Sequence, residues 1–252
     1  MLKKIATYLI FSLAICLTLV AACVFFRPYA IDFFSDSESV EYTPPVVEIG
    51  LACSNDKDCI EVPVIISTID YGFLFAIEKS IDLIREHGVL CIMSGGGDGK
   101  ALLQASTLLR DNSITLCTAD YLQIDGNKHF FDVEFEGRSY QGSACASACG
   151  FLVLSAEKRV HVGVAPLFGI HTPTVVLDFC FCAIPLWPDK RDGLSQMSEF
   201  IDSLPNEDQK IIVRKVYKHS LDTPSELITF LNSEDIEQFN IYNTSINYVD
   251  KN

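Results

Sequence analysis

The sequence has no aspartate or glutamate before Asp32, and it has few basic residues after Arg27. The 252 residues include 19 lysines and arginines and 33 aspartates and glutamates, and Lys3, Lys4 and Arg27 all precede the first acid. Removing these three leaves 16 basic against 33 acidic residues, a net charge of −17. Such a field repels nucleic acid and anionic lipid, so we expect no nucleic-acid partner. The length suits one sizeable domain with its own core.

Metal and phosphate motifs are also missing. No CxxC or HxxxH spacing occurs, so we expect no metal and no cofactor. The glycine-rich stretch SGGGDG at 94–99 is neither GxGxxG nor a P-loop, because Lys100 lacks the surrounding spacing. There are two alternatives to a phosphate site. The stretch is either a turn that leads into a helix, or a loop whose backbone N–H groups donate to an oxyanion.

Residues 5–26 are uncharged and mostly apolar, with basic residues on both sides. At about 1.5 Å per residue, a helix of this length spans a hydrocarbon core of about 30 Å. We therefore expect residues 1–27 to form a single-pass inner-membrane anchor, with the bulk of the chain in the periplasm. A cleaved secretory signal stays open, and so does a lipoprotein with its lipid on Cys23, because VAAC at 20–23 resembles a lipobox.

Ten cysteines fit the same placement, since this density is usual in an oxidising compartment. Cys53 and Cys59 flank a polar loop suited to a disulfide. Cys145 and Cys149 are four residues apart, on one face if helical, and are either a disulfide or buried small hydrophobes. The sequence does not pair the four cysteines in apolar runs, Cys91, Cys117, Cys180 and Cys182.

Beyond the anchor, residues 28–50 are expected to form a stalk and residues 51–252 the globular domain. Apolar runs predict strands at 62–69, 89–93 and 113–118, and periodic spacing predicts helices at 72–87 and 100–110. This βαβαβ order predicts right-handed crossovers and a mainly parallel sheet in an α/β fold.

The rhythm breaks at residues 121–139, where turn signals surround alternating apolar residues and predict an inserted β-hairpin. The chain then returns to regular elements. We expect a helix after Gly150 that ends near Ala156, strands at 160–164 and 167–170, an amphipathic helix at 198–220, and one or two short helices in 225–239.

The stretch 142–171 carries the residues most suited to catalysis. Ser147 lies among small side chains, and His171 follows 24 residues later. A serine becomes a nucleophile when a histidine takes its proton and backbone N–H groups stabilise the oxyanion. Glycines let backbone N–H groups face a ligand, so Gly96 and Gly97 are candidate donors. A structural role is the usual one for a lone serine or histidine, so the order and spacing of the motifs carry the hypothesis.

Three motifs occur in a fixed order, SGGG at 94–97, CASAC at 145–149 and IHTP at 170–173. Over about residues 60–245 this order resembles the Clp protease proteolytic subunit (ClpP) and its crotonase-fold relatives, and within them the extracytoplasmic, membrane-attached members. The resemblance implies a ClpP/crotonase-like spiral of ββα units, homo-oligomers, and a peptide or protein substrate.

Carried over to this chain, the resemblance makes Ser147 the nucleophile and His171 the general base. The oxyanion hole would use Gly96, Gly97 and the N–H of Ala148. The chain departs from the family at Gly95, where the family has proline, and at the triad acid. Ile228 occupies the position of that acid, which leaves Glu226 or Asp222 as the candidate third member.

Two functions therefore remain. The first is a membrane-anchored, extracytoplasmic serine hydrolase, most simply a peptidase. The alternative is a binding or assembly protein that keeps the fold and has lost catalysis, which the isoleucine at 228 favours. A crotonase-like acyl-CoA enzyme is disfavoured, because coenzyme A is not expected outside the cytoplasm.

Overall fold

The computed structural model describes residues 44–54, 58–135, 138–164, 166–172, 175–179, 182–186, 190–223 and 227–244. The expected anchor at 1–27 with Cys23, most of the expected stalk and Glu226 lie outside these ranges. Within them, no helix is both long enough and apolar enough to cross a membrane.

The chain divides into two compact units, and the smaller one contains a β-hairpin. This hairpin pairs β12 (Val175–Phe179) with β13 (Cys182–Leu186) in antiparallel register. The larger unit comprises Pro44–Pro173 and Lys190–Asn252, and it holds every catalytic candidate.

The larger unit is mixed α/β, which confirms the α/β part of the expected fold, and in the described residues its main sheet has seven strands in the order β10-β4-β3-β2-β1-β5-β6. The strands are β1 (Glu48–Cys53), β2 (Cys59–Ile66), β3 (Val89–Met93), β4 (Thr115–Ala119), β5 (Tyr121–Ile124), β6 (Asn127–His129) and β10 (Arg159–Val162). From β2 to β10 the pairing is parallel, as the βαβαβ order predicts. From β2 to β6 it is antiparallel.

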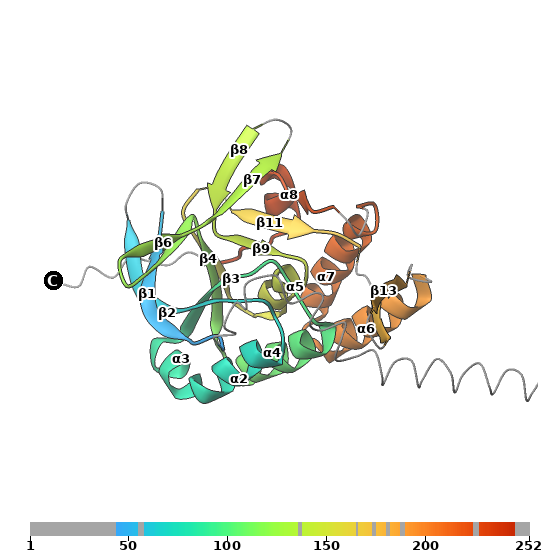
Figure 1. Ribbon diagram of the computed structural model, residues 1–252, viewed down its shortest axis with the longest axis horizontal. Helices are drawn as coiled ribbons and strands as arrows, with labels where there is room; N and C mark the ends of the chain where they lie inside the picture. Colours follow the sequence, from blue (N-terminus) through green and yellow to red (C-terminus); the bar gives the residue numbers. More distant parts are fainter. Residues whose placement is uncertain are drawn as a thin grey trace, which may run out of the picture. The chain divides into compact units, whose positions relative to one another are not determined.

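Two smaller sheets complete this unit. One has the order β14-β11-β9, with β9 (Ala144–Ala146), β11 (Leu167–Ile170) and β14 (Thr229–Phe230). The other pairs β7 (Phe131–Phe135) with β8 (Arg138–Gly142). The segment 121–139, expected as one inserted hairpin, thus spans the β5–β6 hairpin of the main sheet and most of the β7–β8 hairpin, which projects from it (Figure 1).

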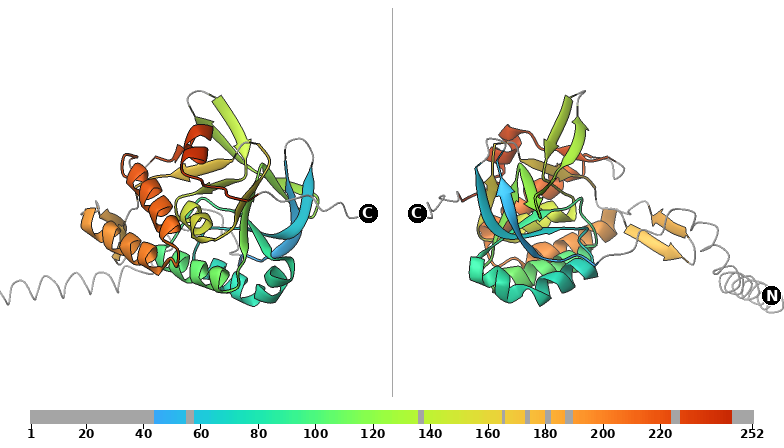
Figure 2. Two further views of the ribbon diagram at one scale, coloured as in Figure 1. Left: turned by 180° about the vertical axis from the view of Figure 1, so that it is seen from behind. Right: turned by 60° about the vertical axis from the view of Figure 1, so that its left-hand side comes forward.

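The helices are α2 (Tyr71–Lys79), α3 (Ile81–His87), α4 (Gly99–Asp111), α5 (Ala148–Ser155), α6 (Lys190–Ser203), α7 (Glu207–Ser220) and α8 (Ser233–Gln238). In both views of Figure 2, α2, α3 and α4 lie along one side of the sheet. The single helix expected at 198–220 is two helices, because Pro205 has no N–H to continue α6 and the Asn206 side chain caps α7.

Side chains of the parallel strands alternate between two hydrophobic clusters. Leu90 and Ile92 of β3 join the cluster on the helix side, whereas Cys91 and Met93 join the cluster on the other side. Helix α5 lies in the first cluster, and all eight of its residues are buried. A helix that is apolar all round is a core helix, so α5 is surrounded by apolar side chains on every face.

Disulfides join Cys53 to Cys59 and Cys91 to Cys117 within the main sheet. The first closes the β1–β2 hairpin, where the two residues face each other in register. The second links β3 to β4, in which Cys91 and Cys117 are also direct partners.

Candidate active site

The three sequence motifs meet because the strands before them are neighbours. Ser94 continues β3 and pairs in parallel with Cys145 of β9, through bonds from Ser94 N to Ala144 O and from Ala146 N to Ser94 O, both 3.0 Å. Strand β9 in turn pairs in parallel with β11. The glycine loop, Ser147 and His171 therefore follow the carboxyl ends of adjacent parallel strands, which is where ligands bind in open α/β sheets.

Ser147 occupies a sharp turn between β9 and α5. Its φ of 55° and ψ of −123° are unusual for a residue with a side chain. It is half-buried, and its hydroxyl does not cap α5. The Ser147 N–H donates to Gly169 O of β11 at 2.9 Å, so the turn is tied to the strand that carries His171.

The glycine loop packs directly against this serine. A Cβ on Gly96 would lie 2.6 Å from Ser147 Cβ and 3.0 Å from Ser147 Oγ, and one on Gly97 would lie 2.1 Å from Ile69 O. Both glycines also have positive φ, 113° and 150°. Position 96 must therefore be glycine if the Ser147 hydroxyl is to keep its place.

Two of the expected oxyanion donors differ in their availability. The Gly96 N–H donates to Ser94 Oγ at 3.1 Å, so it is already engaged. Among the described residues, no acceptor is bonded to the N–H of Gly97. The N–H of Ala148 belongs to the first turn of α5, where helix geometry provides no acceptor within the helix. Gly97 and Ala148 are thus the donors that the local structure leaves for a ligand.

His171 is half-buried, and its Nδ1 lies 2.8 Å from the backbone oxygen of Thr172. A carbonyl oxygen only accepts, so Nδ1 carries the hydrogen in this bond. In the neutral ring Nε2 then keeps its lone pair, which is the form a general base needs. Thr172 is itself held, since its N–H and its Oγ1 both donate to Thr223 O, at 3.1 and 2.6 Å.

An isoleucine lies where the resemblance expects the triad acid. Strands β11 and β14 pair antiparallel, with Ile170 opposite Thr229. Continuing this register by one residue sets Ile228 opposite His171. Asp222 is exposed in the turn after α7, and the described residues give it no hydrogen bond to His171. Glu226 lies outside the described residues, so its role as third member stays a prediction.

No protein-family model matches the chain, and no curated protein matches it either. Solved structures do match, among them two of the 1510-N membrane-bound stomatin-specific protease. One is a serine-to-alanine mutant, and the other is a lysine-to-alanine mutant in complex with a substrate peptide. Each is 13% identical over 74% of this chain, covers 78% and 74% of its own chain respectively, and has a TM-score of 0.46. Likeness at this level transfers neither activity nor residue roles.

Two features of the site were not predicted from the sequence, the Thr172 carbonyl and the Ser94 hydroxyl. The disulfide between Cys145 and Cys149 was one of the two alternatives that the sequence offered for these residues. The spacing CASAC was the one available signal, because it places a cysteine two residues to either side of Ser147. The other two are hydrogen bonds that depend on how the backbone folds, since the acceptor is a backbone carbonyl in one and the donor a backbone N–H in the other.

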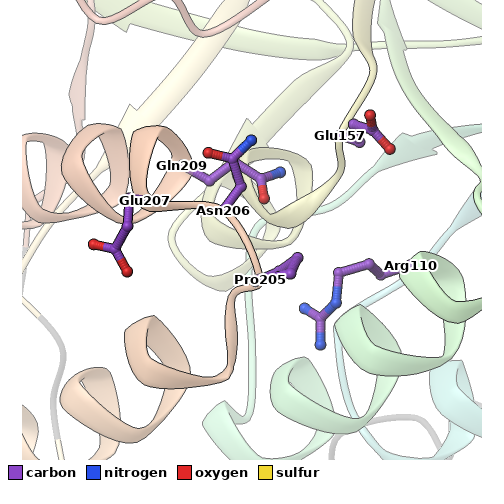
Figure 3. Close-up of a pocket in the computed structure, with 6 residues that line it drawn as sticks. All are labelled: Arg110, Glu157, Pro205, Asn206, Glu207 and Gln209. Carbon is purple, nitrogen blue, oxygen red and sulfur yellow. The ribbon is translucent and has the colours of Figure 1, made fainter.

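A separate pocket of about 470 Å³ contains none of these residues. It is lined by Arg110, Glu157, Pro205, Asn206, Glu207 and Gln209 (Figure 3). Glu207 accepts a hydrogen bond from Lys210 at 2.7 Å, which lowers the pKa of its carboxyl. The mixed charges of this lining favour no single class of ligand.

Proposed function

We propose that the chain is a serine hydrolase, most simply a peptidase, with Ser147 as the nucleophile and His171 as the general base. The observation that carries the proposal is the convergence of Ser147, His171 and the glycine loop at the ends of three adjacent parallel strands. The turn at Ser147 supports it, because a residue held in a sparsely populated backbone conformation is typical of a functional site.

In the proposed reaction, His171 Nε2 takes the proton of Ser147 Oγ as that oxygen attacks the scissile carbonyl. The negative charge that develops on the carbonyl oxygen is stabilised by the N–H groups of Gly97 and Ala148. The protonated His171 then gives its proton to the leaving amine, and water releases the acyl group by the reverse sequence. Gly96 contributes the space that the Ser147 hydroxyl occupies.

The Thr172 carbonyl takes over one of the two tasks of a triad acid. It fixes the tautomer and the orientation of His171. A neutral carbonyl stabilises the imidazolium less than a carboxylate does, so we infer a slower enzyme than a complete triad would give.

The setting of the enzyme is part of the same proposal. We infer a ClpP/crotonase-like ββα spiral, an inner-membrane anchor at residues 5–26, a periplasmic domain and a homo-oligomer. The apolar N-terminal segment and the disulfides of the larger unit support the placement outside the cytoplasm.

A fluorophosphonate probe tests the activity in the full-length chain. We expect labelling at Ser147, loss of labelling in Ser147→Ala, and a decrease of about 10²–10⁴-fold in the labelling rate of His171→Ala. Ser143→Ala is the matched control and should label like the wild type, because the Ser143 hydroxyl is buried and has no hydrogen-bond partner among the described residues.

Absence of labelling in a folded sample at neutral pH would reject the hydrolase. The second candidate, a binding or assembly protein without catalysis, would then hold. Ile228 opposite His171 is the observation that favours it.

A further inference from the structure

The disulfide between Cys145 and Cys149 spans the proposed nucleophile. Cys145 lies in β9 and Cys149 in α5, with Ser147 midway between them. Their Cα atoms are 5.1 Å apart. The bond therefore closes a five-residue ring around Ser147 and joins the strand to the helix across the turn that holds the hydroxyl.

This turn needs a restraint that the rest of the helix start does not supply. Ser147 has a left-handed φ, and such a conformation persists only where the surroundings fix it. Most helices are held at this end by a capping side chain or a first-turn acid. Helix α5 has neither, because the Ser147 hydroxyl makes no capping bond and the first turn has no acidic residue. The Cys145–Cys149 disulfide provides a covalent restraint at the start of α5, which has no side-chain cap.

Backbone hydrogen bonds hold the strand side of the turn more firmly than the helix side. Ala146 N donates to Ser94 O at 3.0 Å, and Ser147 N donates to Gly169 O at 2.9 Å. On the helix side, the bond from Phe151 N to Ser147 O is longer, at 3.4 Å. The Cys145–Cys149 bond fastens this weaker side to the stronger one.

The two disulfides of the main sheet, Cys53–Cys59 and Cys91–Cys117, differ in role from Cys145–Cys149. Cys53–Cys59 closes a hairpin, and Cys91–Cys117 joins two strands that are already paired by their backbones. Cys53–Cys59 encloses no site candidate, and the loop closed by Cys91–Cys117 contains Gly96 and Gly97 but neither Ser147 nor His171. Cys91 and Cys117 are as fully buried as Cys145 and Cys149, so they provide a matched comparison.

We propose that the Cys145–Cys149 disulfide is a positioning element that holds Ser147 in its catalytic conformation and confines activity to an oxidising compartment. The proposal rests on the proposed hydrolase function. In a reducing compartment both cysteines are thiols, and the turn around Ser147 is free to relax. On export, a disulfide-carrying protein oxidant accepts two electrons and two protons from the pair, which forms the S–S bond and leaves two thiols on the oxidant.

The test compares full-length Cys145→Ala/Cys149→Ala with full-length Cys91→Ala/Cys117→Ala. Alanine suits both sites because all four cysteines are buried. We measure the rate of fluorophosphonate labelling, the split between kcat and KM for a peptide ester, and deuterium uptake by the backbone of residues 144–152. Thermal melting reports whether each variant is folded.

For the 145/149 variant we expect at least a tenfold slower labelling rate and a lower kcat with an unchanged KM, because about 1 Å of misplacement can cost about 10²-fold. Deuterium uptake around Ser147 should rise. The 91/117 variant should keep the wild-type labelling rate and uptake in this segment. Equal labelling rates in the 145/149 variant and the wild type would overturn the proposal, and so would an equal loss in both double variants.

Failure of the proposed function is visible separately. If the wild type is not labelled, the hydrolase is rejected, and deuterium uptake alone then tests whether the disulfide restrains the turn. Unchanged uptake in the 145/149 variant overturns the restraint, and faster uptake supports it.

If the 145/149 variant does not melt cooperatively, the wild type is reduced with dithiothreitol and reoxidised, with the state of each cysteine read by mass spectrometry. Labelling should fall and return with this disulfide, and Cys53→Ala/Cys59→Ala should behave like the wild type. Labelling that ignores the state of this disulfide overturns the proposal.

Discussion

At the scale of single residues, the position of the Ser147 hydroxyl depends on the absence of a Cβ at Gly96. Ser147 adopts a conformation that costs roughly 1–3 kcal/mol, and its side chain lies where a Cβ on Gly96 would be. The glycine at 96 and the strained turn at 147 are thus two halves of one arrangement. Changing either should move Ser147 Oγ from the position that the proposed reaction requires.

Gly96→Ala tests this arrangement. The new Cβ would lie 2.6 Å from Ser147 Cβ, so the serine must move. We expect the fluorophosphonate labelling rate to fall by about 10²-fold. The rate is measured on the full-length chain, together with its melting curve.

Gly95→Ala is the control for this change. A Cβ at position 95 meets nothing within 4 Å, and its φ is not positive. We expect the wild-type labelling rate in this variant. A Gly96→Ala variant that labels as fast as Gly95→Ala would show that the glycine loop does not set the position of Ser147.

The residue scale is also where the sequence was least informative. The expected roles of Ser147 and His171 came from side chains, which the sequence states. The Thr172 carbonyl that orients His171 is a backbone group, identical in every residue, so only the fold identifies it. The Cys91–Cys117 pair likewise required the register of β3 against β4.

At the scale of elements, the pairing of β11 with β14 decides what faces His171. Ile170 is opposite Thr229, so the next pair in register is His171 with Ile228. Ile228 is 42% exposed, and its Cγ2 would lie 2.7 Å from a Cβ on Gly169 of β11. A polar side chain at 228 would therefore remain in contact with water and cost little stability.

If the proposed hydrolase function holds, Ile228→Asp should consequently make its reaction faster. A carboxylate facing His171 stabilises the imidazolium that forms when Ser147 loses its proton, which the Thr172 carbonyl does weakly. We expect a several-fold increase in kcat for a peptide ester at neutral pH. Ile228→Asn is the control, because asparagine has the shape of aspartate without its charge. We expect no increase in kcat for this variant. Equal rates in the aspartate and asparagine variants would mean that position 228 does not reach the imidazole.

Elements with strong apolar runs were predicted closely, and elements defined by their partners were not. The runs at 89–93 and 167–170 have the bounds of β3 and β11. By contrast, β9 consists of three small residues, Ala144–Ala146, whose strand propensity is low, and only pairing with β11 makes it a strand. The break between α2 and α3 at Ser80 interrupts a continuous apolar period that gave no sign of it.

At the scale of the whole larger unit, one buried arginine fastens the end of the described chain. Arg159, at the start of β10, is 1% exposed, and burial lowers the pKa of its guanidinium. It donates to three backbone oxygens, those of Ala156, Asn240 and Ile241, at 2.9, 3.0 and 2.7 Å. Its own backbone oxygen accepts from Asn243 and Thr244. The last described segment is thus closed onto an edge strand more than 80 residues away.

Arg159→Met measures how much this closure contributes. Methionine fills a similar volume but leaves the three carbonyl oxygens buried without a donor, and each such loss costs about 1–3 kcal/mol. Allowing for relaxation and access of water, we expect the free energy of unfolding in urea to fall by about 2–4 kcal/mol, a large share of the roughly 5–15 kcal/mol that a domain has. Arg214→Met on the exposed face of α7 is the control and should stay within about 0.5 kcal/mol of the wild type. Equal stability in the two variants would mean that apolar contacts hold the C-terminal segment, such as those of Ile241 in the hydrophobic cluster on the helix side. The hydrogen bonds of Arg159 would then add no measurable stability.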